Sequence, residues 1–373
     1  MKIGFVSNIR APYRTLQLKE YSKIKNTKLN VYYTYPNLDG RKWEVFKAEN
    51  FNEINLNVIK KFGKYGYLNK GIYKLVKEND ILLIGGYEQP TVILTALLCK
   101  LINKPYIIFF DGISTNRLEE KESKLKFIVK KLILRNANAI MANGIIGKKY
   151  FKNKFKIKEE KIYNQFLSID NKSIKELDPY KQEIREYYRK KYEISNESKV
   201  ILYSGRLIDI KNIDCIIRAI SLLDDKNITL LITGDGILKN ELVKLSNKLN
   251  VNIRITGFIK NQQELFKHYF ISDLFILPSL DEAWGLVVNE AMNAGLPVIV
   301  SENCGCSLDL VIEGINGYKF NPLSEIELAS KIKSIFTSDY KKMGLESKTI
   351  ISKWNFKNSR KNIEKIIEKE LKI

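Results

Sequence analysis

The sequence is poor in residues that often carry chemistry, with a single histidine and four cysteines among 373 residues. His268 lies in the stretch ELFKHYF, on an expected helix, without an evident catalytic partner. We therefore interpret His268 as a packing residue and exclude general-base catalysis by histidine. The cysteines form no pair of CxxC motifs, which argues against a disulfide framework and against a metal site; they are Cys99, Cys215, Cys304 and Cys306.

Long apolar segments are also missing. No run of about 18 uncharged apolar residues occurs, and the N-terminal stretch MKIGFVSNIRAPYR lacks an apolar core followed by a small-residue cleavage site. We therefore expect the protein to stay in the cytoplasm.

The net charge of +21 is unevenly distributed along the chain. Residues 1–200 hold 40 Lys and Arg against 21 Asp and Glu, whereas residues 201–373 hold 23 against 21. This excess in the first half favours an anionic partner, either a nucleic acid or an anionic membrane surface. A lysine-rich solvated surface, as an AT-rich genome encodes, explains the same excess without any partner.

Short apolar segments alternate with amphipathic stretches in the first half of the chain, which indicates a mostly parallel sheet with helices on both faces. The expected strands are residues 2–7, 29–34, 80–85, 105–110 and 139–143. After a charged stretch at 168–198, interpreted as a hinge, the alternation restarts. Its expected strands are residues 200–205, 228–234, 252–257, 273–278 and 297–301.

The chain is longer than a single hydrophobic core usually grows, so this restart predicts two domains. We predict an α/β fold with two Rossmann-like doubly wound parallel-sheet domains, residues 1–180 and 181–354, facing a central cleft. Residues 355–373 are expected to form a helix that packs back on the first domain. Ligands of such sheets bind at the carboxyl ends of the strands, so chemistry is expected in the loops that follow them.

Glycines and cations gather in two of those loops. Gly205 and Arg206 follow one expected strand, with Lys211 at the start of the next helix, and Gly234-Asp235-Gly236 follows another. Backbone N–H groups at helix starts, together with two cations, are suited to bind a diphosphate. The Gly234 turn lacks the third glycine of a dinucleotide fingerprint, so a plain strand-to-helix turn remains an alternative.

Two acidic residues bracket a short apolar helix in the stretch EAWGLVVNEAM. Glu282 precedes this helix and Glu290 lies within it, so their carboxylates are on the order of 12 Å apart along a helix. This spacing is too wide for two acids that cooperate on one bond, and it suits two separate contacts with one elongated ligand bearing hydroxyl groups. Alternatively, Glu282 supplies a charge to the helix N-terminus and Glu290 faces solvent.

The segment from Pro278 to Ile299, PSLDEAWGLVVNEAMNAGLPVI, together with Gly205-Arg206-Leu207 and Lys211, resembles the donor site of retaining glycosyltransferases of the GT-B type. More narrowly, it is similar to the group 1, family 4-like enzymes of bacterial glycan assembly. The similarity covers about residues 200–320, including the stretch DLVIEGING at 309–317, and is only architectural before that.

The resemblance implies a role for each matching residue. Glu290 would bind the ribose hydroxyls of a nucleotide sugar. Glu282 would bind the hydroxyls of the transferred sugar, and its neighbours Ala283 and Trp284 would line the sugar pocket. Arg206 and Lys211 would hold the diphosphate without a metal or other cofactor. The remaining donor-site positions would act largely through their backbone, and they are Gly205, Gly234, Ile259, Gly285 and Leu286.

The first half departs from the commonest pattern of that family. A turn containing Arg10 and Arg14 replaces a paired-glycine loop, and both arginines either face the cleft or are simply exposed. Asp111, in the stretch FFDG, stands near the position where many members have a histidine. Asp111 either orients the acceptor hydroxyl or donor sugar, or is only a turn residue.

A basic and aromatic stretch, KFGKYGYLNKGIYK at 61–74, is interpreted as a surface that faces an anionic membrane and meets a lipid-linked acceptor. We therefore hypothesise a metal-independent, retaining hexosyl-type glycosyltransferase of cell-surface polysaccharide assembly, such as capsule or lipopolysaccharide. Its donor would be a nucleotide sugar, with UDP as the expected nucleotide, and it would lie at the inner face of the plasma membrane without binding nucleic acid. The alternatives are a GT-B-type sugar-nucleotide epimerase and, from another class, a basic nucleic-acid-binding protein.

Overall fold

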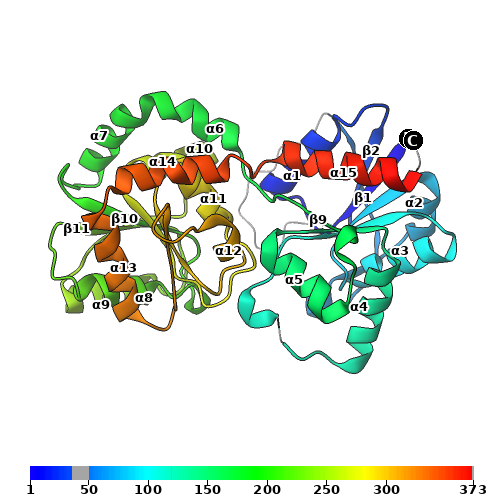
Figure 1. Ribbon diagram of the computed structural model, residues 1–373, viewed down its shortest axis with the longest axis horizontal. Helices are drawn as coiled ribbons and strands as arrows, with labels where there is room; N and C mark the ends of the chain where they lie inside the picture. The colour runs from blue at the N-terminus through cyan, green and yellow to red at the C-terminus, as the bar shows by residue number, and fades with distance from the viewer. Residues whose placement is uncertain (36–49, 119, 372–373) are drawn as a thin grey trace. The chain divides into compact units, whose positions relative to one another are not determined.

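The computed structural model describes residues 1–35, 50–118 and 120–371, and it divides into two compact units (Figure 1). The first unit comprises Met1–Gly112, Leu118–Leu167 and Asn355–Ile373. The second comprises Ile113–Arg117 and Ser168–Trp354. The expected domain boundary at residue 180 lies inside the second unit, because Ser168 and Asn171 donate hydrogen bonds of 2.9 and 3.2 Å to the Trp354 carbonyl.

The first unit is built on a parallel sheet of seven described strands, in the order β3-β2-β1-β6-β7-β8-β9. The strand order reverses at β1, which is the doubly wound pattern expected from the sequence. Its strands are β1 (Lys2–Ser7), β2 (Lys28–Tyr33), β3 (Asn52–Asn55), β6 (Ile81–Gly85), β7 (Tyr106–Phe110), β8 (Ala139–Ala142) and β9 (Ile162–Asn164). A separate antiparallel hairpin pairs β4 (Val58–Lys61) with β5 (Tyr67–Asn69).

Helices of the first unit cover both faces of this sheet. They are α1 (Pro12–Tyr21), α2 (Ile72–Glu78), α3 (Pro90–Leu101), α4 (Lys124–Asn136), α5 (Gly144–Phe155) and α15 (Phe356–Leu371). Pro12 and Pro90 begin α1 and α3, where the missing N–H of proline has no helical partner to lose. The C-terminal helix α15 lies beside α1 (Figure 1), and its Ile363, Ile366 and Ile367 belong to the hydrophobic core of this unit.

The second unit contains a parallel sheet of six described strands, in the order β12-β11-β10-β13-β14-β15. The strands are β10 (Lys199–Ser204), β11 (Ile228–Thr233), β12 (Asn252–Gly257), β13 (Leu274–Leu277), β14 (Val298–Ser301) and β15 (Gly317–Phe320). All residues of β11, β13 and β14 are buried, as expected for parallel strands covered by helices on both faces.

The helices of the second unit include two that precede its sheet in the sequence. The helices are α6 (Asn171–Leu177), α7 (Lys181–Lys191), α8 (Ile213–Ser221), α9 (Lys239–Leu249), α10 (Gln262–Phe270), α11 (Leu286–Asn293), α12 (Ser307–Leu310), α13 (Glu325–Thr337) and α14 (Tyr340–Ile351).

The stretch interpreted as a hinge is firmly anchored in the second unit. Arg189 of α7 is fully buried, donates to four backbone carbonyls, and pairs with Asp273 at 2.8 Å. Asp273 also accepts a 2.8 Å hydrogen bond from the Val200 N–H at the start of β10. A buried charge with its hydrogen bonds satisfied holds α7 to the sheet, so the hinge interpretation is wrong for this helix.

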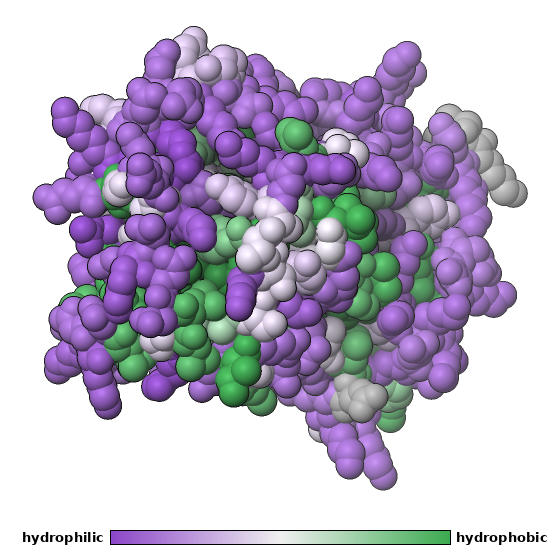
Figure 2. Space-filling view, turned by 60° about the vertical axis from the view of Figure 1, so that its left-hand side comes forward, coloured by the Kyte–Doolittle hydropathy of each residue, from purple (hydrophilic) through white to green (hydrophobic). Residues whose placement is uncertain are grey.

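On the face shown in Figure 2, hydrophilic residues predominate and hydrophobic residues form smaller patches between them. In the described part of the chain, every helix is too short or too polar to cross a membrane.

Candidate active site

The candidate site lies at one edge of the second sheet, where its parallel strands end. The Gly205 N–H donates to the Thr233 carbonyl at 2.9 Å, and the Gly234 N–H donates to the Gly257 carbonyl at 3.0 Å. These bonds join the loops that follow β10, β11 and β12. Ile259, half-buried, lies in the last of these loops.

The glycines after β10 and β11 are required by close packing of the backbone. A Cβ atom on Gly234 would overlap the Gly205 carbonyl oxygen, and one on Gly236 would overlap the Leu207 carbonyl oxygen. The Leu207 N–H also donates to the Asp235 carbonyl at 3.0 Å. The Gly234-Asp235-Gly236 motif therefore has a steric reason that is independent of any ligand.

The two cations assigned to a diphosphate differ in their surroundings. The Arg206 side chain is exposed and makes neither a hydrogen bond nor an ion pair with the described residues. Lys211 instead donates to the Glu282 carboxylate, and both side chains are mostly buried. The Leu280 N–H also donates to the Ile210 carbonyl at 2.9 Å, so the loop that carries Glu282 is held against the loop that carries Lys211.

Glu282 stands on a loop with little freedom. The Gly305 N–H donates to the Glu282 carbonyl at 2.9 Å, and a side chain on Gly305 would overlap the Ala283 carbonyl. Trp284 is buried, donates from Nε1 to the Asn289 side chain at 3.0 Å, and packs on Trp354 with ring centroids 4.6 Å apart. The expectation that Trp284 lines a sugar pocket is therefore wrong.

The helix that contains Glu290, α11, is preceded by a residue with a left-handed backbone conformation. Gly285, with φ of 94°, is the N-cap of α11, and Leu286 is its first residue. This conformation favours glycine because it has no Cβ. The helix start thus lies between Glu282 and Glu290 in the chain, and its first N–H groups provide partial positive charge.

Glu290 is buried in α11, so the alternative in which it faces solvent is excluded. The Tyr269 hydroxyl donates to Glu290 Oε2 at 2.5 Å, and the Gln262 side chain also hydrogen bonds to the carboxylate. Burial raises the pKa of Glu290 to about 7, although the hydrogen bonds from Tyr269 and Gln262 oppose this rise. A carboxyl group with this pKa changes charge in the physiological pH range.

Asp111 lies in the first unit, directly after β7, among three donors. Arg14 Nη2 lies 2.5 Å and Gln165 Nε2 lies 2.8 Å from Asp111 Oδ1, and the Tyr13 hydroxyl lies 3.0 Å from Oδ2. Burial opposes ionisation of Asp111, but Arg14 and these hydrogen bonds outweigh it and lower the pKa of the carboxyl group. Asp111 is therefore held ionised and is more than an isolated turn residue.

Neither arginine of the N-terminal turn is a free exposed cation. The Arg14 side chain is buried against Asp111, and Arg10 pairs with Glu53 at 3.1 Å. The Arg10 guanidinium also stacks on the Tyr33 ring, 4.2 Å from its centroid. Both arginines thus form ion pairs within the first unit.

Several residues of the candidate site were not predicted from the sequence. Asn116 Nδ2 donates to the Leu280 carbonyl at 2.8 Å, and Thr115 Oγ1 donates to the Glu302 carbonyl at 3.1 Å. Both belong to Ile113–Arg117, a short segment that is part of the second unit although the residues on either side of it in the chain belong to the first unit. Tyr269 was missed as well, because an aromatic residue on an amphipathic helix is indistinguishable from a core residue in the sequence.

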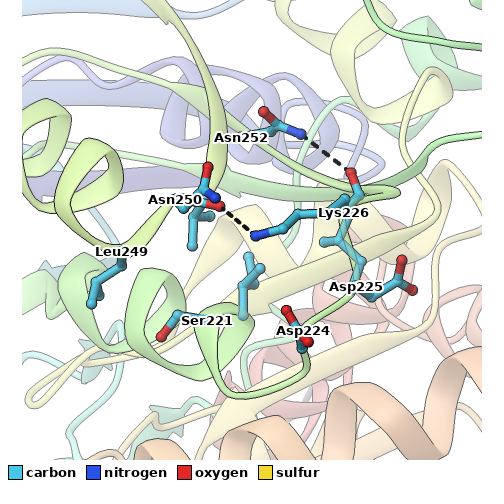
Figure 3. Close-up of a pocket in the computed structure, with 10 residues that line it drawn as sticks. Ser221, Asp224, Asp225, Lys226, Leu249, Asn250 and Asn252 are labelled. Atoms are coloured by element: carbon cyan, nitrogen blue, oxygen red, sulfur yellow. Dashed lines mark hydrogen bonds between the residues drawn. The ribbon is translucent and has the colours of Figure 1, made fainter.

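A pocket with mainly polar lining lies elsewhere in the second unit (Figure 3). It includes Ile228 and Asn252, which begin β11 and β12, so it lies at the sheet edge opposite the candidate site. Lys226 points across it toward the Asn250 carbonyl, and Asn252 Nδ2 donates to the Lys226 carbonyl at 3.2 Å. Neither glutamate of the EAWGLVVNEAM stretch lines this pocket.

The family model of glycosyl transferases group 1 matches residues 184–350, which include Arg206, Lys211, Glu282 and Glu290. This part of the second unit is therefore similar to a glycosyl transferases group 1 domain. The resemblance drawn from the sequence motifs is thereby confirmed. Among the described residues of both units, no group of three or more His, Cys, Asp and Glu side chains is arranged to hold a metal ion.

Sequence relatives agree with the group 1 domain. The chain is 28% identical to Protein CapJ of Staphylococcus aureus over 345 residues, covering 87% of this chain and 82% of CapJ. It is 35% identical over 141 residues to an uncharacterized glycosyltransferase of Methanocaldococcus jannaschii, covering 36% of each chain. A lipopolysaccharide 1,2-N-acetylglucosaminetransferase of Salmonella typhimurium is 26% identical over 200 residues, covering 50% of this chain and 52% of the relative.

Solved structures match along the whole chain. HepE of Anabaena, crystallised in complex with UDP, aligns with a TM-score of 0.77 at 17% identity, covering 99% of this chain and 100% of HepE. WaaG, a glycosyltransferase involved in lipopolysaccharide biosynthesis, aligns with a TM-score of 0.68 at 18% identity, covering 98% of this chain and 99% of WaaG. These likenesses confirm the predicted GT-B fold with two Rossmann-like domains.

The burial of Glu290 leads to a prediction about stability. Its raised pKa means that its stabilising contribution is complete below about pH 4.5 and is lost as the pH rises through about 7. Glu290→Gln, which cannot ionise, should therefore be more stable than the natural chain at pH 8, by up to on the order of 3 kcal/mol, and nearly equal to it at pH 4.5. Melting temperatures at both pH values measure this difference.

The matched control for this measurement is Glu241→Gln on the exposed surface of α9. It should shift the melting temperature little at either pH. If Glu290→Gln changed stability equally at pH 4.5 and pH 8, the ionisation of Glu290 would not be the cause.

Proposed function

We propose that the protein is a retaining glycosyltransferase that uses a nucleotide sugar, with UDP as the nucleotide. The observation that carries this proposal is the arrangement around α11, with the Lys211–Glu282 pair before its start and the buried Glu290 within it. HepE, which shares the fold, was crystallised with UDP, and also with UDP and glucose. These complexes support UDP as the nucleotide to test first.

Each group of the donor would meet a complementary part of the second unit. The Glu290 carboxylate accepts hydrogen bonds from the two ribose hydroxyls, and Glu282 accepts from hydroxyls of the transferred sugar. Arg206, Lys211 and the start of α11 bind the diphosphate. Gly205 and Gly234 allow the backbone to approach closely, and the loop containing Ile259 contacts the base.

The reaction exchanges one bond of the anomeric carbon for another. The bond between this carbon and the diphosphate oxygen breaks, and the acceptor oxygen bonds to the same face of the sugar. The acceptor proton passes to an oxygen of the departing diphosphate. Arg206 and Lys211 stabilise the charge that develops on that diphosphate, so we propose that the reaction is metal-independent.

Asp111 fits an orienting role better than the role of a base. Its carboxylate is ion-paired with Arg14, and its lowered pKa makes it a weak proton acceptor. The side chain nevertheless remains 41% exposed. A hydroxyl group of a ligand can therefore donate a hydrogen bond to it.

The donor is identified by adding UDP-, GDP- and ADP-sugars to the protein and measuring its melting temperature. A bound donor at 100 times its dissociation constant stabilises by about 2.7 kcal/mol. We expect a response to UDP-sugars, abolished or greatly reduced in Glu290→Ala, because a carboxylate bonded to both ribose hydroxyls is lost. Arg206→Ala should lower the rate of sugar transfer about 100-fold, because it removes charge stabilisation of the leaving group.

Exposed residues of the second unit supply the controls. Glu241→Ala and Arg218→Ala, on α9 and α8, should leave donor binding and transfer unchanged. A flat thermal response to every donor, or normal transfer by both site variants, would contradict the proposed function. Salt-sensitive binding to any polynucleotide without a donor response would instead favour the nucleic-acid-binding alternative.

We further propose a hydroxyl of a glycan or lipid-linked molecule as the acceptor, reached by peripheral contact with an anionic membrane. The stretch at 61–74 is a weaker candidate for this contact than expected, because Tyr67 and Ile72 are buried, although Tyr65 and Tyr73 are exposed. Helix α4 of the first unit fits better. Its Leu125, Ile128 and Leu132 are 74%, 60% and 40% exposed and lie on one face of the helix.

The charges of α4 match an anionic surface. The helix has five cations and no acidic residue. Lys126 and Lys130 pair with Glu88, at 3.4 and 2.6 Å, whereas Lys124, Lys131 and Arg135 form no ion pair with the described residues. An exposed apolar stripe bordered by cations that are not ion-paired with described residues is typical of helices that lie in a membrane interface.

Substitution of this stripe tests the membrane contact. Ile128→Asp should weaken sedimentation with phosphatidylglycerol vesicles about ten-fold, because it removes apolar burial and adds repulsion. Phosphatidylcholine vesicles should bind the natural chain weakly. Leu345→Asp, on the exposed surface of α14, is the control, and it should leave binding to both kinds of vesicle unchanged. Equal binding of the Ile128→Asp variant and the natural chain would exclude α4 as the contact.

A further inference from the structure

Buried hydroxyl groups connect the end of β10 to helix α11 in the candidate site. Tyr269, near the end of α10, is fully buried, and its hydroxyl donates to Glu290 Oε2 at 2.5 Å. Ser204 hydrogen bonds to the same tyrosine hydroxyl. Ser204 is the last residue of β10 and directly precedes Gly205 and Arg206. Tyr269 therefore links the end of β10 to the carboxylate on α11.

We propose that Tyr269 is a positioning residue, which fixes the Glu290 carboxylate so that its remaining acceptor sites face the two ribose hydroxyls of a nucleotide sugar. This inference rests on the proposed function and names a residue that the motifs of the sequence do not contain. Tyr269 acts through Glu290 and is not assigned any contact with the donor.

The hydrogen-bonding capacity of the carboxylate supports this role. An ionised carboxylate offers about four acceptor sites on its two oxygens. The protein occupies two of them, through the Tyr269 hydroxyl and the Gln262 side chain. Two sites remain, which equals the number of hydrogen bonds that a pair of vicinal hydroxyls donates. The number of acceptor sites left on the carboxylate therefore matches the two donors of a diol.

Among the residues that the structure describes, none supplies Glu290 with a compensating cation. From α10 it meets Tyr269 and Gln262, both neutral, and Tyr269 is backed by Ser204 and Tyr203 of β10. Lys348 of α14 lies beside Gly295, beyond the C-terminal end of α11, and it is paired with Asp178 at 2.7 Å. The ionised form of Glu290 therefore depends on its two neutral donors, and loss of either donor disfavours it.

The Tyr269 hydroxyl stays protonated, and is therefore a donor, at neutral pH. Burial raises the pKa of Tyr269 well above its ordinary value, and the Glu290 charge acts in the same direction. Of these two groups, Glu290 is the one that titrates near neutrality, with a pKa of about 7. Donor affinity should accordingly rise with pH around 7, as the carboxylate forms.

Tyr269→Phe tests the inference, because it keeps the ring that packs on Phe275 and removes only the hydroxyl. Calorimetric titration with UDP-sugar should show about ten-fold weaker binding at pH 7, the effect of losing a hydrogen bond to a charged group. The pH at which binding is half-maximal should also shift upward relative to the natural chain. We expect kcat at saturating donor to change less than about three-fold, so that the defect appears in KM.

Tyr188→Phe is the matched control. Its hydroxyl also donates to a carboxylate, that of Glu264 on the same helix α10, but neither residue contacts Glu290. This variant should lose comparable stability while donor affinity and its pH dependence stay unchanged. A loss of affinity common to both tyrosine variants would mean that α10 is merely destabilised, which would overturn the inference.

Gln262→Leu provides a second, independent test at a partly exposed position. It removes the other protein donor to Glu290 and should shift the pH midpoint in the same upward direction. If neither Tyr269→Phe nor Gln262→Leu moved affinity or its pH midpoint while Glu290→Ala abolished binding, the positioning role would be refuted and the proposed function would stand. If Glu290→Ala also bound donor normally, the proposed function itself would fail.

Discussion

Parallel pairing of β10 with β11 and β13 is the constraint on which the candidate site depends. Because parallel strands end at the same edge, the loops bearing Arg206, Gly234 and Glu282 are brought together although they are distant in sequence. The overlap that any side chain on Gly234 would cause with Gly205 shows how closely these loops approach. The pair of Lys211 and Glu282 is a direct result of this convergence.

Glu290 is buried without a cationic partner among the described residues, unlike the other buried carboxylate of the second unit discussed above, Asp273. The buried Asp273 is neutralised by Arg189 and Arg185, as buried charges usually are. Glu290 has only neutral donors, so its ionised form is disfavoured in the folded protein. A residue that lowers stability at neutral pH is typical of sites kept for binding or catalysis.

The sequence predicted the elements of the fold better than the contacts between side chains. Strands β10, β11, β13 and β14 were predicted because their apolar runs are bounded by turn residues, whereas β3, β9 and β15 are short and partly polar and were missed. Pairing of Lys211 with Glu282 and of Arg14 with Asp111 was not predictable, because it depends on which loops meet. The segment Ile113–Arg117 belongs to the second unit because Thr115 and Asn116 hydrogen bond to backbone carbonyls of its loops. No local sequence pattern predicts such long-range hydrogen bonds.

Two interpretations failed for a common physical reason. The charged stretch at 168–198 suggested a hinge, yet Arg189 within it is fully buried with its donors satisfied. Trp284 suggested a pocket wall, yet it packs on Trp354 from the distant C-terminal part of the second unit. Residue type alone does not reveal burial when the partner is supplied by tertiary packing.

The most direct test of the central claim is a crystal structure of this chain grown with UDP. We predict that both ribose hydroxyls lie within hydrogen-bonding distance of the Glu290 carboxylate, with the diphosphate between Arg206 and the start of α11. Nucleotide bound at another surface, such as the pocket beside Lys226 and Asn252, with Glu290 making no contact to it, would contradict the account.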